Sequence, residues 1–215
     1  MSFFDEEFPL NGEGYKKSRL AAGGIYKELI ESSGDSMHEF HLVFAALVNR
    51  IMSNSNAHQF LLSNGLVQPA CAMMRCQIET LLYMFAFYKY PQFGNSLSRH
   101  ILNNKPLRSF KRSVEGERVY FSYGALAAMY DQTIPYLEGK SLKVRYDYLC
   151  SYIHPSMQGL YSSVSAISDD GYMELFIDYS GRSEISGRDY NLQIAEMIEY
   201  TCAFASMMQA LIPSA

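Results

Sequence analysis

The amino-acid sequence predicts an all-α fold, a helical bundle with one small β-hairpin or strand near residues 172–187. Hydrophobic residues make up 48% of the chain and charged residues 19%, which is enough apolar surface for a sizeable core. Apolar residues recur at helical spacing in several segments, and the segment before Pro91 is apolar on nearly every side. We expect one domain over residues 15–215, preceded by a loose arm over residues 1–14.

The first two helices are predicted from a periodic pattern and from a start signal. One helix is expected over residues 15–31. The next begins at a capping box, in which Ser36 is the N-cap and Glu39 stands three residues later. Its apolar stripe has helical spacing, and we expect the polar run at residues 54–56 to end it.

The third predicted helix is the most apolar in the chain. Asn64-Gly65 marks a break before it, Pro69 suits its first turn, and Pro91 stops it. A helix that is apolar on nearly all sides belongs at the centre of a bundle. Its longest apolar run, residues 81–88, is too short to cross a bilayer, so we expect no membrane association.

Residues 92–118 are basic. Six basic and two acidic side chains give this stretch a formal charge of +4, although the whole chain carries −4. Such a run forms either a solvated face or a phosphate-binding rim. In the second interpretation, four side chains would contact RNA: Arg108, Lys111, Arg112 and Arg118.

The second half of the chain is predicted to be helical, apart from the hairpin region. Helices are expected over residues 119–131 and 142–153, the latter capped by Ser141. Pro155 is expected to open another helix, whose apolar positions reach residue 167. A last helix is expected over residues 190–211.

Several classes of protein are disfavoured by the composition. The four cysteines lie in apolar runs without a C-x-x-C pair, so they read as buried reduced thiols. Together with an acidic N-terminus that lacks a signal-peptide pattern, this predicts a cytoplasmic location. Phosphate-loop and dinucleotide glycine motifs are absent, and we expect no cofactor. Asp35-x-x-His38-x-x-His41 has spacing that could hold a metal, but the paired motifs of a di-iron bundle are missing, and no metal is predicted.

Arg75 and Glu79 are the first candidate site residues. They lie four apart and therefore share a face of the most apolar helix. Burying two charges costs several kcal/mol per ion, on the order of the whole stability of many domains, unless they are well paired. The pair is therefore either an internal ion pair that fixes helix packing or part of a polar cleft in which Arg75 is available to an anion.

His154 and Ser151 are the second candidates. His154 stands between two predicted helices, beside a helix N-terminus, where exposed N–H groups favour an anion. Its side chain suits proton transfer at neutral pH. The alternative is a histidine that only hydrogen-bonds a neighbouring helix.

Two segments together resemble an uncharacterised HEPN-like family. Arg75-Cys-Gln-Ile-Glu79 is similar to its R-x-x-x-E motif, and residues 148–156, Tyr-Leu-Cys-Ser-Tyr-Ile-His-Pro-Ser, contain a match to its later S-x-x-H-P-S stretch. The order and separation of the two segments also fit. The sequence departs from the standard HEPN signature, in which Arg lies four to six residues before His, because Arg145 lies nine before His154.

The resemblance implies a dimeric helical bundle that acts on RNA in a prokaryotic toxin or antiviral defence system. His154 would be the general acid or base of a metal-independent endoribonuclease, Arg75 would stabilise the phosphate, Glu79 would orient Arg75, and Ser151 would hydrogen-bond the phosphate or the imidazole. The alternative is a non-catalytic HEPN-like module that dimerises or binds an unidentified partner protein. We also expect Arg75, Glu79 and His154 to lie close together.

Overall fold

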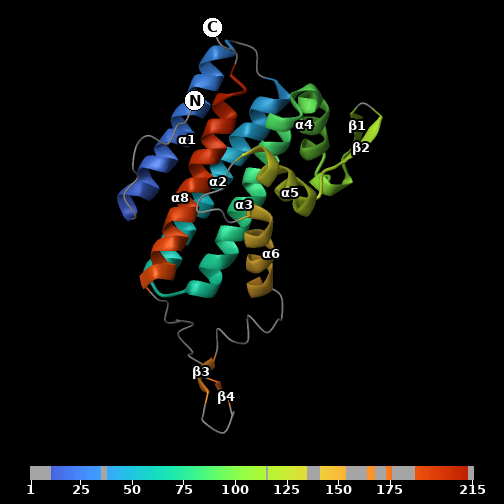
Figure 1. Cartoon of the computed structure of the whole chain (residues 1–215). Coiled ribbons are helices and arrows are strands. Elements are labelled where there is room, and N and C mark those ends of the chain that lie inside the picture. The colour runs from blue at the N-terminus through green and yellow to red at the C-terminus, as the bar shows by residue number, and fades with distance from the viewer. Residues whose placement is uncertain are drawn as a thin grey trace.

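The computed structural model is mostly helical, as the sequence predicts (Figure 1). It describes residues 11–34, 38–114, 116–134, 141–153, 164–167, 173–175 and 187–212. The helices are α1 (Gly12–Ser32), α2 (Glu39–Ser63), α3 (Val67–Lys89), α4 (Gly94–Leu102), α5 (Tyr123–Thr133), α6 (Leu142–Ile153) and α8 (Gly187–Gln209). Two short 3₁₀ turns, η1 (Pro91–Phe93) and η2 (Leu107–Ser109), and four strands complete the described elements: β1 (Lys111–Val114), β2 (Glu117–Tyr120), β3 (Val164–Ile167) and β4 (Met173–Leu175).

Helix α3 lies at the centre of the bundle. It packs against α2, α8, α6 and α5, while α1 covers α8 and α2 (Figure 1). Its side chains from Leu81 to Phe87 are fully or almost fully buried, with the partly buried Tyr83 as the exception. The expected break before it is confirmed, because Gly65 has φ +73°, a left-handed conformation that glycine adopts readily at a helix C-terminus. The expected stop at Pro91 is confirmed as well, since α3 ends at Lys89.

Helix starts near the N-terminus differ from the sequence prediction. Asn11 caps α1 through its side chain, so residues 12–14 are helical and not part of a loose arm. Residues 1–10 lie outside the described part of the chain. Helix α2 begins at Glu39 with His38 as its N-cap, and Ser36 lies outside the described residues.

The polar run at residues 54–56 does not end α2, which continues to Ser63. Ser55 and His58 are buried on the face of α2 that meets the neighbouring helices. The hydroxyl of Tyr15 on α1 lies 2.6 Å from His58 Nδ1. His58 Nε2 lies 3.3 Å from Gln193 Oε1 on α8. The prediction of a helix end was wrong: Ser55 lies buried within the continuous helix and accepts a hydrogen bond of 3.4 Å from Arg19 Nη1 on α1.

A β-hairpin occupies a part of the basic segment that the sequence analysis did not assign to strands. Strands β1 and β2 pair antiparallel, with Lys111 opposite Tyr120 and Val114 opposite Glu117. Gly116 has φ +86°, which suits the two-residue connection between them. The helix expected from residue 119 therefore begins only at Tyr123, where the Ser122 side chain accepts a hydrogen bond from Ala125 N.

The second half of the chain contains the one hairpin that was expected, displaced toward the N-terminus. Strands β3 and β4 pair antiparallel, and only β4 lies within the expected residues 172–187. The helix expected from Pro155 to residue 167 is wrong at its C-terminal end, because residues 164–167 form β3 and satisfy their backbone by pairing with β4. Helices α6 and α8 are confirmed, the latter beginning three residues earlier than expected.

Candidate functional site

The two motif-bearing segments lie on neighbouring helices. Arg75 and Glu79 are on α3, and α6, which carries the start of the second motif, packs directly against α3. The Tyr146 hydroxyl on α6 donates a hydrogen bond of 3.3 Å to Glu79 Oε1. The first motif is therefore joined to the helix of the second by a side-chain contact.

Glu79 is the centre of a polar cluster that we call the Glu79 cluster: Arg50, Arg75, Glu79 and Tyr146. Arg75 Nη2 lies 3.1 Å from Glu79 Oε1, and Arg50 Nη2 on α2 lies 3.5 Å from Oε2. The Glu79 side chain is 13% exposed and the Arg75 side chain 23% exposed. One carboxylate thus links helices α2, α3 and α6, and Arg75 remains reachable from solvent.

The surroundings in the cluster favour the charged form of Arg75 and the protonated form of the Tyr146 phenol. Burial alone would lower the pKa of Arg75, but the hydrogen bond with Tyr146 and the attraction of Glu79 together raise it. Burial raises the pKa of Tyr146 to about 12, and the Glu79 carboxylate acts in the same direction. At neutral pH, Tyr146 is therefore a hydrogen-bond donor and not a base.

Aromatic rings extend the cluster along α3. The Arg75 guanidinium carbon lies 5.7 Å from the centre of the Tyr146 ring, within cation–π range. Tyr123 contacts both Tyr146 and Tyr83, with ring centres 6.1 Å apart in each pair. Burial and a hydrogen bond with Tyr83 raise the pKa of Tyr123. These rings hold Tyr146 in place beside Arg75.

The remaining predicted catalytic residues lie at the C-terminal end of α6. The Ser151 hydroxyl donates a hydrogen bond of 2.6 Å to the Tyr148 carbonyl oxygen, one turn earlier. His154 lies outside the described residues and follows Ile153, the last residue of α6, in the sequence. The structure therefore brings Arg75 and Glu79 together and places both beside Tyr146 of α6, while the position of His154 stays a prediction.

A second buried ion pair was not anticipated as a pair. Arg145 Nη2 on α6 lies 2.5 Å from Glu196 Oε2 on α8, with side-chain exposures of 13% and 4%. Arg145 also stacks on the Tyr148 ring, with 5.2 Å between its guanidinium carbon and the ring centre. A glutamate between Ala195 and Met197 in an apolar helix was the sequence signal that could have indicated a buried partner.

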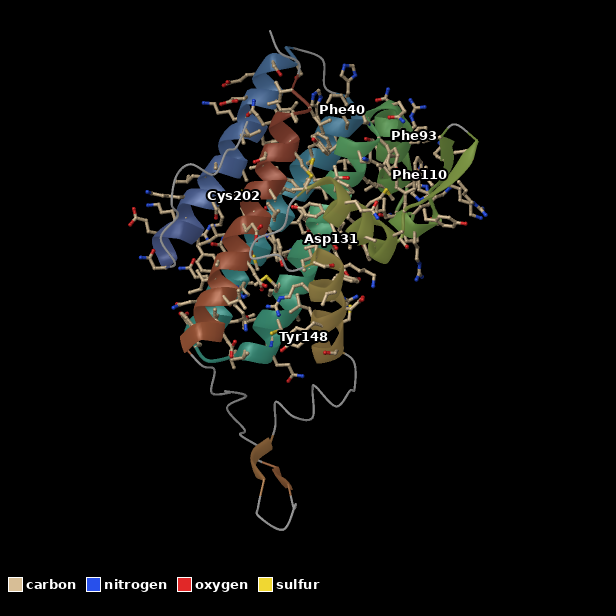
Figure 2. The ribbon with its side chains drawn as sticks, viewed as in Figure 1. Phe40, Phe93, Phe110, Asp131, Tyr148 and Cys202 are labelled. Carbon is tan, nitrogen blue, oxygen red and sulfur yellow. The ribbon has the colours of Figure 1, made fainter. Side chains whose placement is uncertain are left out.

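The four predicted RNA-binding residues lie elsewhere. Arg108 is in η2, and Lys111, Arg112 and Arg118 are in β1 and β2; all four are exposed. The hairpin projects from the bundle beside α4 and α5, whereas α6 runs away from it toward the opposite end, where Figure 2 labels Tyr148. The structure therefore separates the basic residues from the last turn of α6.

Within the described residues, no group of three or more His, Cys, Asp or Glu side chains is arranged to hold a metal ion. Asp35, His38 and His41 have spacing that could hold a metal, but Asp35 lies outside the described residues. His41 Nδ1 accepts a hydrogen bond of 2.9 Å from the backbone N–H of His38. None of the described helices combines the length and hydrophobicity needed to cross a membrane.

Comparisons with models of known protein families, with characterised proteins and with solved structures yield no match to this chain. Support for a function therefore comes from the residues themselves and from the resemblance of two motifs to those of an uncharacterised HEPN-like family.

Proposed function

We propose that this protein is a metal-independent endoribonuclease of HEPN type, acting in the cytoplasm as part of a prokaryotic toxin or antiviral defence system. One observation carries the proposal: the R-x-x-x-E pair on α3 contacts α6, the helix that ends one residue before His154. The Arg75 guanidinium carbon lies 5.7 Å from the ring centre of Tyr146 on that helix. This arrangement supports a site in which a cation and a histidine act on one phosphate.

The proposed reaction uses the ribose 2′-hydroxyl as nucleophile. His154 accepts the proton of this hydroxyl while water protonates the leaving 5′-oxygen; in the complementary role, His154 protonates the 5′-oxygen while water takes the proton of the hydroxyl. The 2′-oxygen bonds to phosphorus, the bond to the 5′-oxygen breaks, and a 2′,3′-cyclic phosphate remains. Arg75 stabilises the negative charge that develops on the phosphate, Glu79 orients Arg75, and Ser151 hydrogen-bonds the phosphate or the imidazole.

A second candidate function, a non-catalytic dimeric interaction module, is favoured by two features of the same region. Three donors already occupy the Glu79 carboxylate, which is the pattern of a cluster that fixes helix packing. Val144 and Tyr148 are exposed and lie four apart on α6. Such an apolar stripe fits a helical interface with a second copy, or with an unidentified partner protein.

The first experiment compares wild type with His154→Ala on single-stranded RNA in the presence of EDTA. Wild type is expected to cleave, and the variant should be slower by roughly 10²–10⁴, the usual contribution of one acid–base group. His38→Ala, which changes an exposed histidine at the start of α2, is the matched control and should cleave like wild type. Melting temperatures are measured for all three proteins.

Equal residual cleavage by wild type and His154→Ala would contradict the nuclease and leave the interaction module as the better account. The module is tested by light scattering. Wild type should be dimeric at micromolar concentration, and Val144→Glu should be monomeric, because a charge in an apolar interface is costly. A wild-type monomer at high micromolar concentration would contradict dimerisation in both candidate functions.

A further inference from the structure

One face of the β1–β2 hairpin is exposed and carries two cations beside a tyrosine ring. Successive side chains of a strand point to opposite faces, so the pairing of Lys111 with Tyr120 and of Ser113 with Arg118 places these four residues on one face. All four are exposed, Tyr120 at 62%. We call this set, Lys111, Ser113, Arg118 and Tyr120, the hairpin face.

The hairpin face is held firmly by the residues at its base. Phe110 and Phe121 flank the two strands, are 4% and 1% exposed, and lie with ring centres 5.0 Å apart. Phe121 contacts Tyr90, and Phe110 contacts Phe93, so both are anchored at the end of α3 (Figure 2). The exposed tyrosine is therefore presented on a fixed support, which lowers the entropy cost of binding.

The hairpin face carries positive charge that none of the ion pairs among the described residues neutralises. Within the part of the chain that the structure describes, no ion pair joins Lys111 or Arg118 to a carboxylate. The Arg118 guanidinium carbon lies 6.0 Å from the centre of the Tyr120 ring, and Lys111 is the cross-strand neighbour of the same ring. The basic segment has a formal charge of +4 in a chain whose net charge is −4. Such a local excess is complementary to a polyanion.

A hollow of about 390 Å³ lies beside this ring, between the hairpin and α5. Arg118 and Tyr120 line it, together with Tyr90 and Met129. Its size falls within the range of roughly 300–1,000 Å³ that small-molecule sites occupy. A planar group that stacks on Tyr120 would lie beside the apolar side chain of Met129 and the guanidinium of Arg118.

We propose that the hairpin face binds single-stranded RNA, with Tyr120 stacking on a base and Lys111 and Arg118 contacting the adjacent phosphates. An exposed aromatic ring between cations is the arrangement by which proteins hold single strands, because every base offers a π face and the phosphates follow the charge. In a duplex the bases are already stacked on each other and cannot stack on Tyr120. The inference rests on the proposed function in one respect, that the ligand is RNA.

The test measures binding of a fluorescent single-stranded RNA by anisotropy, with every variant built on His154→Ala so that the RNA is not consumed. Tyr120→Ala should weaken binding about tenfold, the effect of losing one base–aromatic stack, and Tyr120→Phe should retain most of the affinity. Phe60→Ala on α2 is the matched control, because Phe60 is 65% exposed and far along the chain from the hairpin. It should bind like the parent.

The charge contribution is measured by the salt dependence of the same binding. Lys111→Ala and Arg118→Ala should each lower the slope of log affinity against log salt by about 0.7, the value for one phosphate contact on a single strand. Lys17→Ala, an exposed lysine on α1, should leave the slope unchanged. Melting temperatures establish that every variant is folded.

The outcomes separate this inference from the proposed catalysis. RNA binding that depends on Tyr120, in a protein that never cleaves RNA, would uphold the hairpin face and overturn the nuclease. Cleavage with binding that Tyr120→Ala does not weaken would overturn the hairpin face and leave the nuclease standing. Equal affinity for a duplex and a single strand would also overturn the stacking role of Tyr120.

Discussion

The Glu79 cluster and the hairpin face each place two cations near one tyrosine, yet the surroundings of these charges differ. In the cluster, a nearly buried carboxylate receives Arg50, Arg75 and the Tyr146 hydroxyl, and three helices are joined by these contacts. On the hairpin face the cations are exposed, and Arg118 lies over the exposed ring of Tyr120. The charges of the Glu79 cluster therefore support the fold as well as any site. We expect that the charges of the hairpin face can be changed without loss of stability.

The largest change in the free energy of unfolding is expected from a substitution that breaks the Glu79 cluster. Glu79→Ala removes the carboxylate that pairs with Arg75 and Arg50 and should lower the free energy of unfolding by about 4 kcal/mol, because a partly buried guanidinium is left without its anion. Urea denaturation measures the change. Glu31→Ala is the matched control, since Glu31 forms an ion pair of the same i,i+4 spacing with Lys27 but on the surface. It should cost less than about 0.5 kcal/mol. Similar losses in both variants would contradict a structural role of the cluster.

A second prediction concerns the buried histidine of α2, which has no counterpart in the hairpin. Burial lowers the pKa of His58 from 6.5 to about 4. Below pH 6.5 the unfolded chain therefore binds a proton that the folded protein does not bind. The contribution of His58 to the free energy of unfolding is complete at pH 7 and is lost as the pH falls toward 4. The expected loss from this residue is about 3 kcal/mol.

Chemical denaturation of wild type and His58→Gln at pH 7 and pH 4 measures this contribution. Burial also lowers the pKa of His41, which acts in the same direction, so the difference between the two proteins isolates His58. The dependence on pH should be weaker in His58→Gln. An identical pH dependence in both proteins would show that His58 does not titrate as its burial implies.

The smallest expected effect is on the hairpin. Lys111→Ala and Arg118→Ala should each change the free energy of unfolding by no more than about 0.5 kcal/mol, because both side chains are exposed. Thermal unfolding followed by circular dichroism measures it. A substantial loss of stability in either variant would mean that these cations support the fold, and the contrast between the two regions would disappear.

The sequence predicted those parts of the fold that depend on local signals. Gly65, Pro69 and Pro91 delimit α3, and its uniform hydrophobicity places it in the centre, as observed. The pairing of Arg75 with Glu79 followed from their spacing of four. Each of these inferences uses information within one helix.

The features that were missed depend on contacts between elements. No Asn-Gly or Asp-Gly sequence marks the β1–β2 hairpin, and its strands are polar and basic. Arg50 and Tyr146 join Glu79 from other helices, and no spacing along the chain indicates such partners. Helix α2 passes through residues 54–56, where Ser55 accepts a hydrogen bond from Arg19 on α1, a contact that no spacing along the chain indicates. Sequence patterns give helices more readily than the polar contacts between them.

The most direct test of the central claim is the chemistry of the RNA products. Wild-type protein is incubated in EDTA with a single-stranded RNA and with the same RNA methylated on every 2′-oxygen, and product ends are identified by mass spectrometry. A reaction in which the 2′-oxygen attacks phosphorus under catalysis by His154 and Arg75 predicts 2′,3′-cyclic phosphate ends from the first RNA and no cleavage of the second. Cleavage of the methylated RNA at the same rate, or 5′-phosphate ends, would contradict it.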